Sequence, residues 1–129
     1  LMTMMGAIAG RGSAQEPYLL DKVTSMTGTA ARSTGTSGTM HLWNADTCQA
    51  LADMLRNNVT ETYGQSRFGD LPVCAKSGTA EVGQGKAPHS WFAGFVDSDD
   101  LPLAFVALVE NGGGGSAVAQ VLRTAAELL

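Results

Sequence analysis

Residues 73–82 read Val73-Cys74-Ala75-Lys76-Ser77-Gly78-Thr79-Ala80-Glu81-Val82. Small and β-branched residues alternate at the start of this segment, which is typical of a partly buried strand. A glycine removes the side-chain wall of a strand, so a ligand can come close to the main chain at Gly78. Alternation places Lys76 with Gly78 on one face and Ser77 with Thr79 on the other. If the strand twists at Gly78, the lysine and both hydroxyls can reach one carboxylate, so the sequence predicts an anion-binding strand edge.

The composition is that of one globular domain. The 129 residues are 44% hydrophobic and 16% charged, with a net charge of −4, which is not the composition of a disordered chain. Binding a nucleic acid requires clustered Lys and Arg that neutralise phosphates. The eight basic residues of this sequence are scattered instead. We therefore expect a single domain unit, residues 1–129, and no nucleic-acid partner.

The cysteines and histidines, Cys48, Cys74, His41 and His89, could together supply four metal ligands. They lack the C-x-x-C spacing of a zinc ribbon or a thioredoxin-like motif. Two small buried thiols and two unrelated imidazoles explain them better, and we expect neither a metal nor a cofactor. The sequence leaves a disulfide between Cys48 and Cys74 open, because it does not give the distance between them.

The first residues are apolar at helical spacing, with Leu1, Met4, Met5 and Ile8 on one stripe and Gly10 as a plausible stop. Roughly ten apolar residues are too few to span a bilayer, which needs ~20. They also lack the pattern of a signal peptide. A natural protein rarely starts inside an apolar helix, so we expect this chain to be a segment of a longer protein.

The region before residue 73 combines strands with a helix. We expect strands at residues 19–25 and 40–43, and a loop at residues 27–39, where Gly, Ser and Thr dominate. Asn44 is a candidate N-cap of an amphipathic helix whose apolar stripe ends at Val59. That stripe is expected to pack on a sheet.

The region after the helix completes the sheet. Residues 60–71 are a predicted connector, and residues 90–96 alternate around three aromatic side chains, as a strand does. Residues 101–109 are almost wholly apolar, which predicts a central strand covered on both faces. Short turns join these strands into an antiparallel meander. Ser116 is a candidate N-cap of a closing helix.

Three motifs in this order resemble the C-terminal part of a penicillin-binding protein transpeptidase domain. They are Lys76-Ser77-Gly78-Thr79-Ala80-Glu81, His89-Ser90-Trp91-Phe92-Ala93-Gly94-Phe95 and Glu110-Asn111-Gly112-Gly113. Lys76-Ser77-Gly78 fits the K-T-G element of the serine enzymes that react with penicillin, with serine in the threonine place. The resemblance covers most of the chain. It implies an α+β fold of the β-lactamase/transpeptidase type, an antiparallel sheet flanked by helices, of which residues 1–129 form the C-terminal portion.

The resemblance also implies a role for each residue of this element. As a catalytic residue, Lys76 would place positive charge near a substrate carboxylate and hold the hydrogen-bond network of the missing serine motif. The hydroxyls of Ser77 and Thr79 would bind that carboxylate. The backbone N–H of Thr79 would form half of an oxyanion hole, and its C=O would pair with the substrate amide. Gly78 would permit this close approach. The structural alternative for Lys76 is an edge-strand lysine that discourages aggregation. The structural alternative for His89 is a packing or capping role.

The nucleophile and its base are absent from this sequence. The family takes them from S-x-x-K and S-x-N elements, and no serine here has lysine three residues later or asparagine two residues later. We therefore expect the chain to be inactive alone. In a parent protein, the resemblance implies penicillin binding and D,D-transpeptidation of peptidoglycan through an acyl-serine.

The implied partners are a peptidoglycan stem peptide or a β-lactam, together with the remaining N-terminal part of the domain. The implied location is the extracytoplasmic face of the bacterial cell membrane, with an anchor outside this chain. Alternatives are a β-lactamase-like hydrolase and a non-catalytic domain that senses or binds β-lactams or acts as a scaffold. Self-association of the segment is a further alternative.

Overall fold

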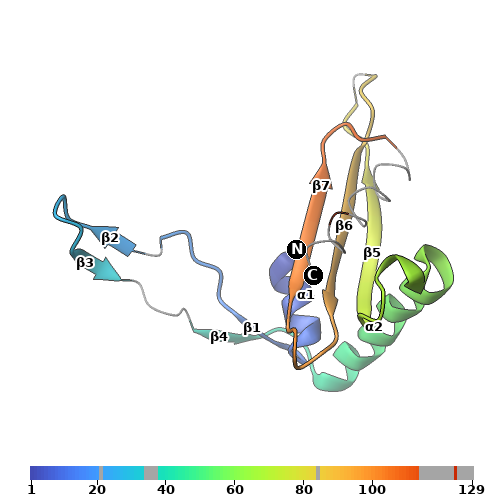
Figure 1. Cartoon of the computed structure of the whole chain (residues 1–129), viewed down its shortest axis with the longest axis horizontal. Coiled ribbons are helices and arrows are strands. Elements are labelled where there is room, and N and C mark those ends of the chain that lie inside the picture. The colour runs from blue at the N-terminus through green and yellow to red at the C-terminus, as the bar shows by residue number, and fades with distance from the viewer. Residues whose placement is uncertain (21, 34–37, 84, 114–123, 125–129) are drawn as a thin grey trace.

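The chain folds into a body from which a thin arm extends (Figure 1). The computed structural model describes residues 1–20, 22–33, 38–83, 85–113 and 124. The body contains a three-stranded antiparallel sheet and the helices that pack on it. The expected α+β fold with an antiparallel sheet flanked by helices is confirmed. Apart from residue 124, the helix predicted after Ser116 falls outside the described residues.

The sheet consists of β5 (Val73–Ala80), β6 (His89–Val96) and β7 (Ala104–Val109), in the order β5-β6-β7. The predicted meander is therefore confirmed. Within the described part of the chain, β6 is the central strand, and β7 is an edge strand whose side chains are mostly half-buried. Among the described residues β7 has a partner strand on one side alone, so the central position predicted for residues 101–109 is not seen there. An apolar sequence does not show which strands lie beside it in a sheet. The first residues of this segment form a turn, in which the Leu103 N–H donates to Leu101 O at 2.9 Å.

Two hydrophobic clusters lie on opposite faces of the sheet, because successive side chains of a strand alternate. One cluster joins residues of the segment after the second helix to the sheet: Val59, Phe68, Val73, Ala75, Phe92 and Val96. The other joins the two α-helices to the sheet: Ile8, Ala52, Cys74 and Phe95. These helices are α1 (Met2–Ala9) and α2 (Ala45–Asn57). The predicted N-terminal and amphipathic helices are thus both confirmed as core elements.

Helix α2 begins where the sequence indicates and ends differently. Asn44 caps it, since the Thr47 N–H donates to Asn44 Oδ1 at 2.8 Å. Its last α-helical residue is Asn57, and one π-helical segment, η1 (Asn58–Tyr63), continues it. A short 3₁₀ turn, η2 (Gln65–Arg67), follows. The predicted connector at residues 60–71 is therefore partly helical.

The described residues of the arm form four short strands. Strand β1 (Ser13–Gln15) pairs with β4 (Thr39–His41), and β2 (Lys22–Thr24) pairs with β3 (Ala30–Ser33), both antiparallel. The predicted strands at residues 19–25 and 40–43 are present in shorter form. The predicted loop at residues 27–39 was wrong for β3, because backbone pairing in a hairpin does not need apolar side chains. The arm exposes Leu19, Leu20, Val23 and Met26 to solvent.

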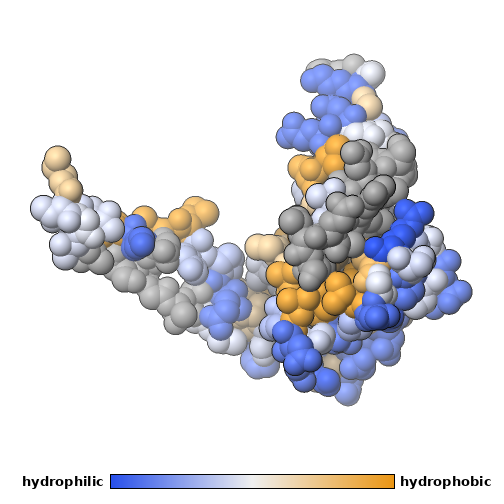
Figure 2. All heavy atoms as spheres, viewed as in Figure 1, coloured by the Kyte–Doolittle hydropathy of each residue, from blue (hydrophilic) through white to orange (hydrophobic). Residues whose placement is uncertain are grey.

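Polar and apolar residues are distributed differently over the surfaces of the body and the arm (Figure 2). Polar residues dominate the outward surface of α2 and the tip between β5 and β6, whereas apolar surface is visible low on the sheet and on the arm. None of the helices in the described ranges is long and apolar enough to cross a bilayer.

Candidate functional site

The first half of the outer edge of β5 is closed by side chains. Strand β5 pairs with β6 on its other side, so the backbone groups of alternate residues point away from β6. Arg56 Nη1 donates to Val73 O at 3.1 Å, and Asn58 Nδ2 donates to Ala75 O at 3.3 Å. Both donors lie where α2 passes into η1, next to β5 (Figure 1). Side chains thus satisfy the first two outward carbonyls in place of a neighbouring strand.

Tyr63, the last residue of η1, makes the next contact along this edge. The Ser77 N–H donates to Tyr63 Oη at 2.7 Å, and the Tyr63 hydroxyl donates to Ser77 Oγ at 3.0 Å. The Tyr63 ring meets the buried Phe92 ring edge to face, with centroids 5.6 Å apart and planes at 84°. Packing and two hydrogen bonds therefore fix the phenol against one residue of the predicted site.

The edge changes character beyond Ser77. The Ser77 carbonyl accepts a hydrogen bond from Lys76 Nζ at 2.7 Å, so the ammonium lies at the edge although Lys76 and Ser77 alternate in direction. The same alternation that aims the Ser77 N–H at Tyr63 aims the N–H and C=O of Thr79 outward. Thr79 is exposed, and no side chain from the described part of the chain caps its backbone.

Gly78 has room around it within the described structure. A Cβ built at this position would lie 3.5 Å from Trp91 Cβ, which is ordinary van der Waals contact. A Cβ at Gly94, by contrast, would collide with Cys74 O and lie 2.9 Å from Phe105 Cζ. Packing inside the sheet therefore requires glycine at position 94 and does not require it at position 78.

The structure brings three of the predicted groups to one short edge: the Lys76 ammonium, the Ser77 hydroxyl and the Thr79 backbone. Their binding roles stay predictions. Sequence reasoning missed Arg56, Asn58 and Tyr63. A single tyrosine before a glycine in a predicted connector carries no periodic signal, and only the three-dimensional path of η1 reveals it.

The two thiols lie in the core, away from this edge. Cys48 and Cys74 are both buried and free, so the structure shows no disulfide between them. Burial, assisted by the negative charge of Asp97, raises the pKa of the Cys74 thiol from 9.0 to about 11. Cys74 is therefore protonated at neutral pH, which is unsuitable for a nucleophile.

His89 stabilises the far end of the sheet. Its Nδ1 accepts the Asn111 N–H at 2.9 Å, and the neighbouring Ser90 hydroxyl donates to Gly113 O at 2.7 Å. The capping role considered for His89 is confirmed. Among the described residues, no group of three or more His, Cys, Asp or Glu side chains is placed to hold a metal ion.

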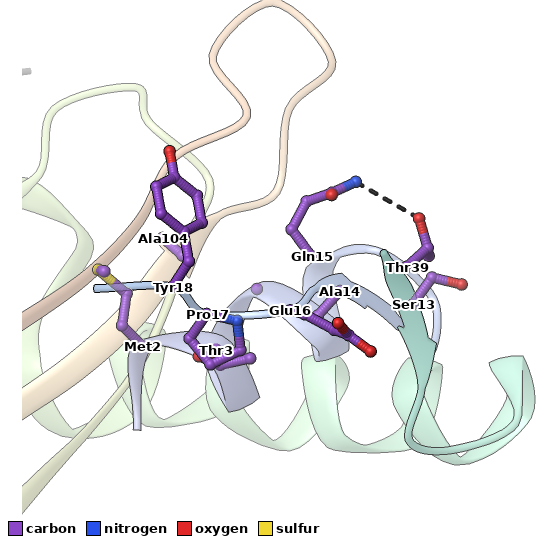
Figure 3. Close-up of a pocket in the computed structure, with 11 residues that line it drawn as sticks. Met2, Thr3, Ser13, Ala14, Gln15, Glu16, Pro17, Tyr18, Thr39 and Ala104 are labelled. Atoms are coloured by element: carbon purple, nitrogen blue, oxygen red, sulfur yellow. Dashed lines mark hydrogen bonds between the residues drawn. The ribbon is translucent and has the colours of Figure 1, made fainter. Parts of the chain in front are cut away.

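A hollow of about 650 Å³ lies elsewhere, between α1 and the base of the arm (Figure 3). Its walls come from α1, β1 and the segment Glu16-Pro17-Tyr18, and Gln15 Nε2 donates to Thr39 Oγ1 at 3.5 Å on one side. No residue of β5 lines it. The hollow is therefore separate from the predicted edge site.

Comparison with known proteins identifies relatives of this chain. The chain is 26% identical to peptidoglycan D,D-transpeptidase PbpA of Mycolicibacterium smegmatis over 109 residues, which are 82% of this chain and 22% of that protein. The D,D-transpeptidase domain of a peptidoglycan glycosyltransferase from Eggerthella lenta superposes with a TM-score of 0.71 at 26% identity, over 98% of this chain and 31% of that one.

An imipenem acyl-enzyme complex of penicillin-binding protein A from M. tuberculosis has the same fold. Its TM-score is 0.74 at 22% identity, over 99% of this chain and 30% of that one. The chain thus spans about a third or less of the relatives it matches. The family model of the penicillin binding protein transpeptidase domain matches residues 1–127. This chain therefore belongs to the penicillin-binding protein transpeptidase domain family.

Proposed function

We propose that the open edge of β5 is the carboxylate-binding and oxyanion strand of a serine D,D-transpeptidase site. The supporting observation is that the Lys76 ammonium and the Thr79 backbone, which no described side chain caps by a hydrogen bond, lie on the same edge of β5 in a chain of this family. The parent protein would supply the nucleophilic serine and its base from outside this chain. The reaction would transfer the acyl group of a peptidoglycan stem peptide first to that serine and then to an amine.

The chemistry of acyl transfer explains what this edge would contribute. Attack of a serine hydroxyl on a carbonyl carbon places negative charge on the carbonyl oxygen, and preorganised N–H donors stabilise that charge. The outward N–H of Thr79 is such a donor. Its C=O would accept the amide N–H of a substrate that adds to β5 as a short strand.

The terminal carboxylate of the ligand would lie next to Ser77. The Lys76 ammonium is at this position, and the hydroxyls of Ser77 and Thr79 can donate to carboxylate oxygens. A β-lactam carries both a carboxylate and a reactive carbonyl, so the same groups would bind it. Contacts within the described sheet do not require glycine at position 78. We propose instead that the missing side chain leaves space for the ligand.

We place the parent protein at the extracytoplasmic face of the cell membrane, where peptidoglycan is cross-linked. Its partners would be stem peptides, β-lactams and the rest of the transpeptidase domain. A hydrolase built on the same edge would also acylate, and the rate of deacylation separates the two activities.

Replacing Thr79 in the parent protein tests the oxyanion role. Thr79→Ala removes the hydroxyl and keeps the N–H, whereas Thr79→Pro removes both, and proline is tolerated on an edge where the N–H faces solvent. We expect acylation by a fluorescent penicillin to be at least ~100-fold slower in Thr79→Pro than in Thr79→Ala. Equal rates in two folded variants would contradict the role. Rapid release of the labelled acyl group from the unaltered protein would indicate the hydrolase.

A further inference from the structure

We propose that Tyr63 is a positioning residue of the carboxylate site, which orients the Ser77 hydroxyl and ends the open edge. This inference rests on the proposed function of β5. It assigns a task to a residue outside the Lys76-Ser77-Gly78-Thr79 strand.

The hydrogen bonds of Tyr63 determine where the Ser77 hydrogen can point. A phenol has one hydrogen to donate, and Tyr63 donates it to Ser77 Oγ at 3.0 Å. The phenol oxygen already accepts the Ser77 N–H at 2.7 Å. The hydrogen of the Ser77 hydroxyl is therefore left for another acceptor. A carboxylate bound at this edge is such an acceptor, and a chain of hydrogen bonds from Tyr63 through Ser77 would strengthen that contact.

The π-helical backbone of η1 positions Tyr63 beside Ser77. Residues five apart lie on different sides of an α-helix, which has 3.6 residues per turn, whereas a π-helical segment brings them closer to one side. The Gly64 N–H donates to Val59 O at 2.8 Å, closing a π-type turn, and Asn58 and Tyr63 both reach the edge of β5. Such turns are rare and frequently occur at functional sites.

The position of Tyr63 also limits the length of ligand that can pair with β5. A strand added to this edge would pair with Thr79 and, one step further, with the Ser77 N–H. Tyr63 already occupies that N–H. A ligand chain must therefore end beside Ser77, which favours a peptide terminating in a free carboxylate over one that continues.

The experiment compares two ligands that differ in the carboxylate. We would measure the second-order rate constant of acylation of the full-length parent protein by penicillin G and by its methyl ester. Tyr63→Phe keeps the ring against Phe92 and removes the hydroxyl. The matched control is Tyr18→Phe, the same change at the other tyrosine of the chain, which is 54% exposed on the arm.

We expect Tyr63→Phe to slow acylation by penicillin G about tenfold or more, as for loss of a hydrogen bond that supports a charged ligand. Acylation by the ester should change much less, and Tyr18→Phe should change neither rate. An equal loss for both ligands would show a purely structural role and overturn the inference, as would no loss at all. Ser77→Ala adds a second test, since Tyr63→Phe should have little further effect on the carboxylate preference in that background; an undiminished effect would also overturn it.

Failure of the proposed function would look different. In that case the unaltered parent protein would not form a covalent adduct with either ligand, whatever residue occupies position 63.

Discussion

The thiol of Cys74 shows how a single buried residue links stability to pH. Its pKa rises from 9.0 to about 11 because burial disfavours the thiolate and Asp97 adds negative charge. The folded chain therefore holds this proton more tightly than the unfolded chain. The resulting stabilisation is fully present below pH 9 and is lost as the pH rises towards 11.

We expect the loss to be on the order of 1–2 kcal/mol in the free energy of unfolding, with two pKa units at ~1.4 kcal/mol each as its upper bound. Urea unfolding of the protein and of its Cys74→Ala variant at pH 8 and pH 10.5 measures it. The difference between the two proteins should shrink at the higher pH, because alanine has no proton to lose. A difference that is the same at both pH values would contradict the assignment.

At the scale of elements, the same substitution should have different effects on stability at two glycines of neighbouring strands. Gly94→Ala would push a methyl group into Cys74 O and the Phe105 ring, and we expect a loss of about 1–3 kcal/mol in stability. Gly78→Ala would meet only Trp91 Cβ at 3.5 Å, so stability should be nearly unchanged. If a ligand approaches the main chain at Gly78, acylation of the Gly78→Ala variant by a penicillin should nevertheless be ~10- to 100-fold slower.

Melting temperatures and acylation rates of the two variants in the parent protein measure these effects. A Gly78→Ala variant with normal acylation would show that no ligand approaches the main chain there. A Gly94→Ala variant as stable as the unaltered protein would show that β5 and β6 can separate locally.

The elements also show which features a sequence can predict. Local chemistry predicted the β5 strand, the meander and the Asn44 cap, because each depends on neighbours within a few positions. The π-helical end of α2 was missed, and the hydrogen bonds that Arg56 and Asn58 make there with carbonyls of β5 are tertiary contacts that leave no local signal. Tyr63 was missed for the same reason, and β3 was missed because hairpin pairing does not depend on apolar residues.

At the scale of the whole molecule, the proposed edge site would need a nucleophile from outside this chain. We expect residues 1–129 alone to form no covalent adduct with a penicillin, because no serine in the sequence has the lysine or asparagine spacing of the family's other elements. Intact mass after incubation, with the parent protein as positive control, measures this. An adduct mapped to a serine of this chain would contradict the expectation.

The arm and the body also differ in how their surfaces are used. Large apolar side chains on the arm, including Leu19 and Met26, are fully exposed, whereas the two clusters of the body bury Phe68, Phe92 and Phe95. The family assignment covers both the arm and the body, since the family model of the transpeptidase domain matches residues 1–127. The geometry of the edge site depends only on the body.

The caps on β5 have a consequence for the order in which the molecule assembles. Arg56 and Asn58 each bond to a residue 17 positions later, and Tyr63 bonds to one 14 positions later. Closing loops of this size costs less entropy than closing longer ones, and contacts of lower sequence separation form faster. We therefore expect the edge to acquire its final geometry early in folding, as a preformed surface on which the serine-bearing part of the domain later docks.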